Sequence, residues 1–335
     1  MMMMGTGMLE GWKKKKGVIV LDGGNGEELG KRVKLDEKLW GSEVFADVLE
    51  EEEVSPESNP MYAVHAAYVD AGSDVITTHT YQATREGYAG ALGWEDGHDA
   101  KFQACLARAA EVALAAAARK EGTLVALSCG SYGASLGDGS EFTGVYGGGV
   151  GKEQLVAFHA HRMRAMRPLV ERGLDLLAVE TIPCLEEVKA ILEVLEGEGA
   201  TLGAWISLSG HGEDGERMAD GTHLSQVGEV VQAFVDRVGD GIVVGLGLNC
   251  VDPERAWTGL GVLAGAVGIG LVVYPNAGGV FDAVSKTWDD QLGAEGVAGQ
   301  VGDWTRALDG RLVAVGGCCQ LGPTYISCLV SAVRG

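Results

Sequence analysis

Two adjacent cysteines, Cys318 and Cys319, follow a short apolar run and two glycines in the stretch RLVAVGGCC at residues 311–319. Free cysteines are often small buried apolar residues and nothing more. A disulfide framework is disfavoured, because seven cysteines in 335 residues is an odd number and a sparse set. A reactive thiol pair or a metal site remains, and the choice depends on which other residues the fold brings to this pair.

Eight short apolar runs are predicted to be the β-strands that position such residues. They are residues 17–24, 74–81, 123–131, 175–183, 203–209, 241–250, 270–279 and 311–319. Continuous apolar runs are typical of parallel strands covered on both faces. Helical patterns lie between them, at residues 99–120, 152–172, 185–196, 223–237, 253–267 and 297–308. This alternation predicts an α/β fold, a single (β/α)8 TIM-type barrel over residues 1–335, with a doubly wound open sheet as the second possibility.

Chemistry in such a barrel lies at the C-terminal ends of the strands. Polar and thiol residues collect at the predicted ends: Asp22, Thr80, Ser128, Glu180, Asn249, Cys250, Asn276, Cys318 and Cys319. Alternate strands share a layer, so Cys250 on the sixth strand is expected to meet the cysteine pair on the eighth. Three sulfurs suit zinc, and three protein ligands leave one position open for a substrate. The other four cysteines are expected to be core or surface residues.

Longer motifs identify a family. The chain resembles the homocysteine S-methyltransferases through LDGGNGEELG, AGSDVITTHTYQAT, SYGASLGDGSEFTGVYG, ETIPCLEEVKAI, GLGLNC, VVYPNAGG and VGGCC, which together cover nearly its whole length. This resemblance implies that Cys250, Cys318 and Cys319 bind zinc, and that Asp22 and Glu180 hold the amino group of homocysteine. Acids at strand ends also cap helices or pair with arginines, which is the competing interpretation.

Four further residues bear on the substrate site. Thr80 is a candidate substrate-binding residue. Asn249, beside a proposed zinc ligand, is a second candidate and is also suited to a structural hydrogen bond. His79 stands where relatives commonly have asparagine, and Gly279 where some have glutamate. A zinc ligand at His79 is disfavoured, because the resemblance already supplies three sulfurs.

The resemblance implies methyl transfer from a sulfonium, S-methylmethionine or secondarily S-adenosylmethionine, to the thiol of L-homocysteine. The segments at residues 131–147 and 274–279 look like the sulfonium-using branch rather than the betaine enzymes, which carry a further C-terminal segment. Selenocysteine methyl transfer and a metal-binding or redox-sensing role are the alternatives. A doubly wound S-adenosylmethionine enzyme is disfavoured because no strand leads into a suitable glycine-rich loop. The chain also ends too soon after the cysteine pair for a cobalamin module.

Composition limits the partners. The formal net charge of −21 disfavours nucleic acid and anionic membranes, which select basic surfaces. No apolar run is long enough to span a bilayer. We therefore expect a cytoplasmic enzyme of small-molecule substrates with no obligatory protein partner. Residues 1–16, with their lysine run, are expected to be a flexible N-terminus.

Overall fold

The computed structural model describes residues 17–36, 38–49, 54–198, 202–210, 214–278, 280–282, 287–289 and 292–335. The expected flexible N-terminus and Gly279 lie outside these described residues. In the described part of the chain, the helices are all too short or too polar to cross a bilayer.

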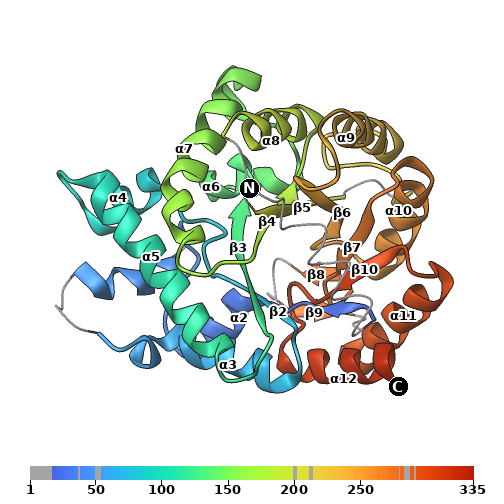
Figure 1. Ribbon diagram of the computed structural model, residues 1–335, viewed down its shortest axis with the longest axis horizontal. Coiled ribbons are helices and arrows are strands. Elements are labelled where there is room, and N and C mark those ends of the chain that lie inside the picture. Colours follow the sequence, from blue (N-terminus) through green and yellow to red (C-terminus); the bar gives the residue numbers. More distant parts are fainter. Residues whose placement is uncertain are drawn as a thin grey trace.

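Eight parallel strands form a nearly closed barrel with helices around it (Figure 1). The strands are β1 (Ile19–Val20), β2 (Val75–Thr77), β3 (Leu124–Gly130), β4 (Leu176–Ile182), β5 (Gly203–Leu208), β6 (Val243–Asn249), β7 (Gly270–Tyr274) and β10 (Leu312–Val315). Each lies within one of the eight runs predicted to be strands. Strand order follows the chain from β2 to β7 and then passes to β10 and β1. The TIM-type barrel is confirmed, and the open doubly wound sheet is wrong because the order contains no reversal.

The two ends of this sheet meet at β1 and β2. The Asp74 amide donates to the Val20 carbonyl over 2.7 Å, and the Val20 amide donates to the Asp74 carboxylate over 3.0 Å. Just beyond the strands, the Thr77 amide donates to the carboxylate of Asp22 over 2.7 Å. Side chains therefore complete the closure of the barrel where the strands are shortest.

A ring of helices covers the outside of the sheet (Figure 1). Its members are α3 (Pro60–Ala71), α5 (His98–Ala117), α7 (Lys152–Val170), α8 (Leu185–Gly197), α9 (Leu224–Val238), α10 (Pro253–Ala266), α11 (Gly293–Ala307) and α12 (Pro323–Arg334). Six of them match the predicted helical segments, and α3 and α12 are additional. The start of α3 has clear local causes: the Asn59 side chain accepts from the Met61 amide over 3.0 Å, and Pro60 occupies the first helical position.

Shorter elements lie in the connections between the strands and the long helices. They are α2 (Asn25–Gly30), α4 (Arg85–Leu92), α6 (Tyr132–Leu136), the 3₁₀ helices η1 (Ser42–Leu49), η2 (Pro56–Ser58), η3 (Ser140–Phe142) and η4 (Gly147–Gly149), and an antiparallel pair, β8 (Val280–Asp282) with β9 (Thr287–Asp289). The pair lies at the end of the predicted strand 270–279 and was not expected from the sequence.

The barrel has two hydrophobic clusters, and their positions limit where a ligand can bind. A large one fills the space between sheet and helices. A smaller one fills the barrel interior and consists of Ile19, Leu21, Val75, Ala126, Leu176, Ala178, Trp205, Val244, Val272, Tyr274 and Ala314. Because side chains occupy the interior, ligands have room at the mouth formed by the C-terminal strand ends.

Candidate active site

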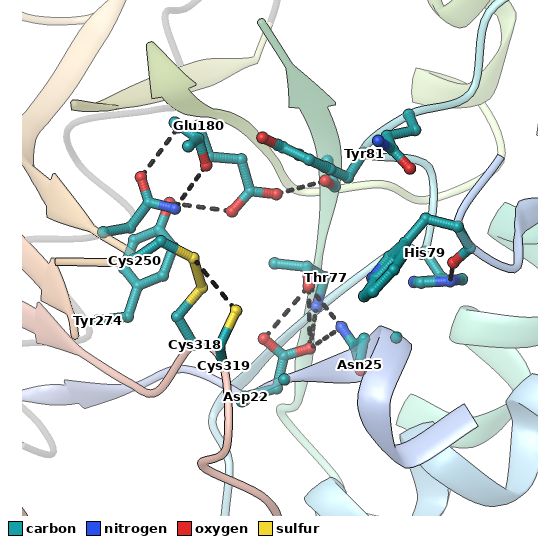
Figure 2. Close-up of a pocket in the computed structure, with 18 of the residues that line it drawn as sticks. Asp22, Asn25, Thr77, His79, Tyr81, Glu180, Cys250, Tyr274, Cys318 and Cys319 are labelled. Atoms are coloured by element: carbon teal, nitrogen blue, oxygen red, sulfur yellow. Dashed lines mark hydrogen bonds between the residues drawn. A yellow bond between two sulfur atoms is a disulfide. The ribbon is translucent and has the colours of Figure 1, made fainter. Parts of the chain in front are cut away.

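A cavity of about 400 Å³ lies at the C-terminal ends of the strands (Figure 2). Residues from at least six strand ends line it, among them Asp22, Thr77, Ser128, Glu180, Asn249, Cys250, Tyr274, Cys318 and Cys319. The residues predicted to bind metal or substrate are all in its wall, with the exception of Thr80. The volume is within the range of pockets that enclose small molecules.

The sulfurs of Cys250, Cys318 and Cys319 converge at one point of this wall, within 4.8 Å of one another. The Sγ atoms of Cys250 and Cys319 are 3.9 Å apart, and Cys250 forms a disulfide with Cys318, their Cα atoms being 5.4 Å apart (Figure 2). Among the described histidines, cysteines and acids, only these three residues form a cluster with the spacing of a metal site. The layer argument from β6 and β10 correctly anticipated this meeting.

Backbone contacts hold the three cysteines in place. Cys250 follows β6 directly in the left-handed region, with φ of 51°, and its amide donates to the Tyr274 carbonyl over 3.1 Å. Such a conformation is unfavourable for a residue with a side chain and is often found at functional sites. The amide of Cys318 donates to the Pro275 carbonyl over 2.8 Å. The ends of β6 and β10 are thus both tied to the chain that leaves β7.

The two glycines before Cys318 allow close packing. Neither Gly316 nor Gly317 has a positive φ, so they do not serve to supply a left-handed backbone. Instead, a Cβ on Gly316 would lie 2.7 Å from the Cβ of Leu21, and one on Gly317 would lie 2.7 Å from the Cβ of Leu321. Gly316 thus allows close packing against the end of β1, and Gly317 allows close packing against the start of α12.

Burial controls the charge of the Cys319 thiol. Desolvation raises the pKa of Cys319 to about 12. A thiol with this pKa is neutral at pH 7 and becomes an anionic ligand when a cation binds beside it. The remaining cysteines lie away from the cavity, as expected: Cys105, Cys129 and Cys184 are buried, and Cys328 is half-buried on α12.

Asp22 lies just beyond β1 and is 5% exposed. Its carboxylate accepts from the amide and hydroxyl of Thr77, over 2.7 and 3.0 Å, and from the Asn25 amide nitrogen over 3.0 Å. Burial raises the pKa of Asp22 to about 6, and these hydrogen bonds partly oppose the increase. Among the described residues, the hydrogen-bond partners of this carboxylate are Thr77 and Asn25, rather than an arginine.

Glu180, on β4, is the second buried acid of the cavity. It accepts from the Ser128 hydroxyl and, over 3.0 Å, from the Tyr274 hydroxyl. Burial raises the pKa of Glu180 to about 7, and the same hydroxyls oppose the increase. Figure 2 shows Glu180 and Asp22 on either side of the cysteines. A cationic group that binds near the sulfurs would therefore meet two carboxylates.

Asn249 fixes the end of β4. Its side-chain oxygen accepts from the Thr181 amide over 2.9 Å, and its nitrogen donates to the Thr181 hydroxyl over 2.7 Å. Thr181 has φ of 59°, so this pair of bonds supports an unfavourable backbone conformation directly after Glu180. Asn249 thus orients the wall that carries the acid.

Thr80 does not line the cavity, contrary to the prediction that it binds substrate. It is fully buried, and its hydroxyl donates to the Ser128 carbonyl over 2.7 Å. Strand β2 ends at Thr77, whereas the predicted run extends to residue 81, and the Thr80 side chain is turned into the wall. His79 does line the cavity, on the side away from the cysteines (Figure 2), and its Nε2 bonds the Trp40 carbonyl over 2.7 Å.

The cavity also contains residues that the sequence analysis did not single out. The aromatic residues Trp40, Tyr81, Phe142, Trp205 and Tyr274 line it, and so does Glu141 of η3. Glu141 is 8% exposed, and its Oε2 is buried with no hydrogen-bond partner among the described residues. It lies in the quoted segment 131–147, but that segment has no periodicity from which its orientation could have been inferred.

Comparison with known proteins agrees with this geometry. A family model described as homocysteine S-methyltransferase matches residues 19–333. Homocysteine S-methyltransferase of Escherichia coli (strain K12) is 36% identical over 94% of this chain and 95% of its own length. Selenocysteine Se-methyltransferase of Brassica oleracea var. italica is 31% identical over 95% of this chain and 90% of its own. The crystal structure of homocysteine methyltransferase MmuM from Escherichia coli, metallated form, superposes with a TM-score of 0.76 at 31% identity and covers 96% of this chain and 99% of that one. The chain belongs to the homocysteine S-methyltransferase family.

Proposed function

We propose that this protein transfers a methyl group from a sulfonium donor to the thiol of L-homocysteine, at a zinc ion held by Cys250, Cys318 and Cys319. The observation that carries the proposal is the convergence of three sulfurs in a cavity at the mouth of the barrel. Membership of the homocysteine S-methyltransferase family supports the reaction class.

The donor set fits zinc. Zn–S bonds of about 2.3 Å in a tetrahedral site put neighbouring sulfurs about 3.8 Å apart. The Sγ atoms of Cys250 and Cys319 are 3.9 Å apart. Binding requires all three thiols in reduced form, so the disulfide between Cys250 and Cys318 must open first. Bound Zn²⁺ would keep the homocysteine thiol deprotonated and nucleophilic at neutral pH.

Two buried acids are suited to the amino group of homocysteine. Asp22 and Glu180 flank the sulfurs, and each already accepts hydrogen bonds that fix its orientation (Figure 2). An ammonium beside them would gain charge-assisted hydrogen bonds in a largely desolvated place. Asn249 contributes indirectly, by holding Thr181 next to Glu180. We therefore assign Asn249 a positioning role.

In the reaction, the homocysteine sulfur attacks the methyl carbon of the donor in line. A new S–CH₃ bond forms as the donor S–CH₃ bond breaks, and the electron pair of the broken bond stays on the donor sulfur. An anion and a cation become two neutral thioethers, so a site with little water favours the transition state. Trp40, Tyr81 and Trp205 line the cavity, and aromatic rings attract a sulfonium cation.

S-Methylmethionine is the donor we expect, with S-adenosylmethionine second. A sulfonium leaves as a neutral thioether, which is a better leaving group than the tertiary amine that betaine would release. Initial rates with S-methylmethionine, S-adenosylmethionine and betaine at matched concentration, with homocysteine saturating, test the order. Betaine as the fastest donor would overturn the donor assignment and leave the cysteine site standing.

Selenocysteine is the second candidate acceptor, because a selenocysteine Se-methyltransferase is among the similar proteins. The ratio of kcat/KM for homocysteine and selenocysteine with one donor decides between them. The need for three reduced cysteines suggests a reducing compartment, so we propose a cytoplasmic enzyme. Tight zinc without turnover of any donor would instead favour a metal-binding or redox-sensing protein.

A further inference from the structure

Four acids of the described chain line the cavity: Asp22, Glu180, Glu27, whose carboxylate accepts from the Gln320 amide, and Glu141, which has no task in the proposed reaction. Asp22 and Glu180 each accept hydrogen bonds at both carboxylate oxygens. The Oε2 of Glu141 is equally buried but has no partner in the described residues. A buried polar atom without a partner loses its hydrogen bonds to water, so such atoms are rare in folded proteins and call for an explanation.

Several contacts fix the backbone around Glu141. Movement of this segment therefore does not explain why Oε2 has no hydrogen-bond partner among the described residues. The Ser209 hydroxyl donates to the Glu141 carbonyl over 2.6 Å. A Cβ on Gly133 would lie 2.6 Å from the Glu141 amide nitrogen, which shows how closely α6 packs against this residue. The amide of Ser140 donates to the Asp138 carboxylate over 3.0 Å.

One buried acid, Glu187 of α8, fixes both ends of the segment that carries Glu141. It accepts from the Tyr132 amide over 2.5 Å and from the Tyr146 hydroxyl. His159 of α7 bonds the same carboxylate over 2.8 Å. Since Glu187 is fully buried and both of its oxygens are engaged, segment 132–146 is attached to the helices rather than free to fold away.

The segment forms the outer wall of the cavity. Gly137, Gly139 and Phe142 line the cavity with Glu141, and Phe142 is 36% exposed. Tyr81 lines the same cavity. Glu141 therefore lines the same cavity as the three sulfurs and the carboxylates of Asp22 and Glu180.

We propose that Glu141 binds the α-ammonium group of the methyl donor. The inference rests on the proposed function, in which two amino acids share the cavity. Asp22 and Glu180 serve the ammonium of homocysteine, and the donor brings a second ammonium that needs its own acceptor. A sulfonium carries no hydrogen that can bond to Oε2, whereas an ammonium has three. Glu141 thus selects sulfonium donors that are amino acids.

The test compares two donors that differ only in the amino group, S-methylmethionine and 4-(dimethylsulfonio)butanoate. Loss of a charge-assisted hydrogen bond costs about 1.5–3 kcal/mol, so Glu141→Gln is expected to raise the KM for S-methylmethionine roughly 10-fold to 100-fold. The KM for homocysteine and the KM for the donor without an amino group are expected to change less than about 2-fold. Calorimetric titration of zinc-loaded protein with S-methylmethionine gives the same comparison without turnover.

Two further variants complete the design. Glu229→Gln, at an exposed position of α9, is the matched control and is expected to behave as the parent with both donors. Glu141→Asp keeps the charge but shortens the reach, and is expected to weaken S-methylmethionine binding less than Glu141→Gln. It also serves as the test if the glutamine variant loses zinc or melts at a lower temperature.

The outcomes separate the two proposals. Equal losses with both donors, or a raised KM for homocysteine, would overturn the role of Glu141 while leaving methyl transfer intact. Unchanged kinetics in Glu141→Gln would do the same. A parent protein that transfers methyl from neither donor but binds S-methylmethionine through Glu141 would overturn the proposed function alone.

Discussion

At the scale of single residues, we propose that the three cysteines bind one zinc ion. We expect the purified, reduced protein to hold about one zinc per chain, because its three sulfurs lie within 4.8 Å of one another. Cys250→Ser, Cys318→Ser and Cys319→Ser are each expected to lose most of the zinc, since a hydroxyl is a poor substitute for a thiolate. Elemental analysis measures this. Cys328→Ser is the control, and full occupancy in any of the three would remove that residue from the ligand set.

Replacement of Glu180 is expected to weaken homocysteine binding more than zinc binding. Glu180→Gln removes the charge opposite the substrate ammonium but retains a side chain of the same size. Since a charge-assisted hydrogen bond is worth about 1.5–3 kcal/mol, the dissociation constant for homocysteine should rise at least roughly 10-fold at unchanged zinc content. Titration calorimetry together with metal analysis checks both quantities. Unchanged affinity would leave Glu180 with a structural task only.

The protonation of the two acids predicts a pH dependence. Burial raises the pKa of Asp22 to about 6 and that of Glu180 to about 7, so both are increasingly neutral as the pH falls from 8 to 6. The ionised forms bind the ammonium, and homocysteine affinity should therefore decrease over this range. In Glu180→Gln the decrease should be shallower. A parallel slope in parent and variant would contradict the prediction.

At the scale of elements, Glu187 links α8 to both ends of segment 132–146. Glu187→Ala should leave several donors unsatisfied, at a cost of about 1–3 kcal/mol each, and so loosen this segment. Faster amide hydrogen exchange in residues 132–146, with unchanged exchange in β6 and β10, is the expected result. Glu186→Ala, one residue away and exposed, is the control. Equal exchange in both variants would show that Glu187 does not hold the segment.

The sequence predicted the strands well because each is a continuous apolar run, and the helices between them because their periodicity is regular. Its errors have local causes. Thr80 was assigned to the site by assuming that the second strand reaches residue 81, whereas β2 ends at Thr77. Glu141 was missed because no strand or long helix carries it, and only the folded chain shows that it is buried without a partner.

At the scale of the whole molecule, the proposed metal joins β6 to β10, whose cysteines are 68 residues apart in sequence. A ligand that binds the folded state alone stabilises it by RT ln(1 + [L]/Kd), about 2.7 kcal/mol at a concentration of 100 Kd. Zinc added to reduced, metal-free protein should raise the melting temperature by on the order of 5 °C. Calorimetry with and without chelator measures the shift, which should vanish in Cys319→Ser. An equal shift in that variant would indicate zinc binding elsewhere.

Barrel closure and the proposed substrate recognition share one side chain. The carboxylate of Asp22 receives the Thr77 amide at the junction of β1 and β2, and the same carboxylate faces the cavity. This double duty limits how the protein can evolve or be redesigned. Lengthening β1 to strengthen the junction would take the Thr77 amide away from Asp22 and change its affinity for a proton, while a substitution chosen to alter the substrate would weaken the closure. Barrel closure and substrate binding are therefore expected to change together. A new substrate preference is more easily gained in segment 132–146, because Glu141 is not part of a strand.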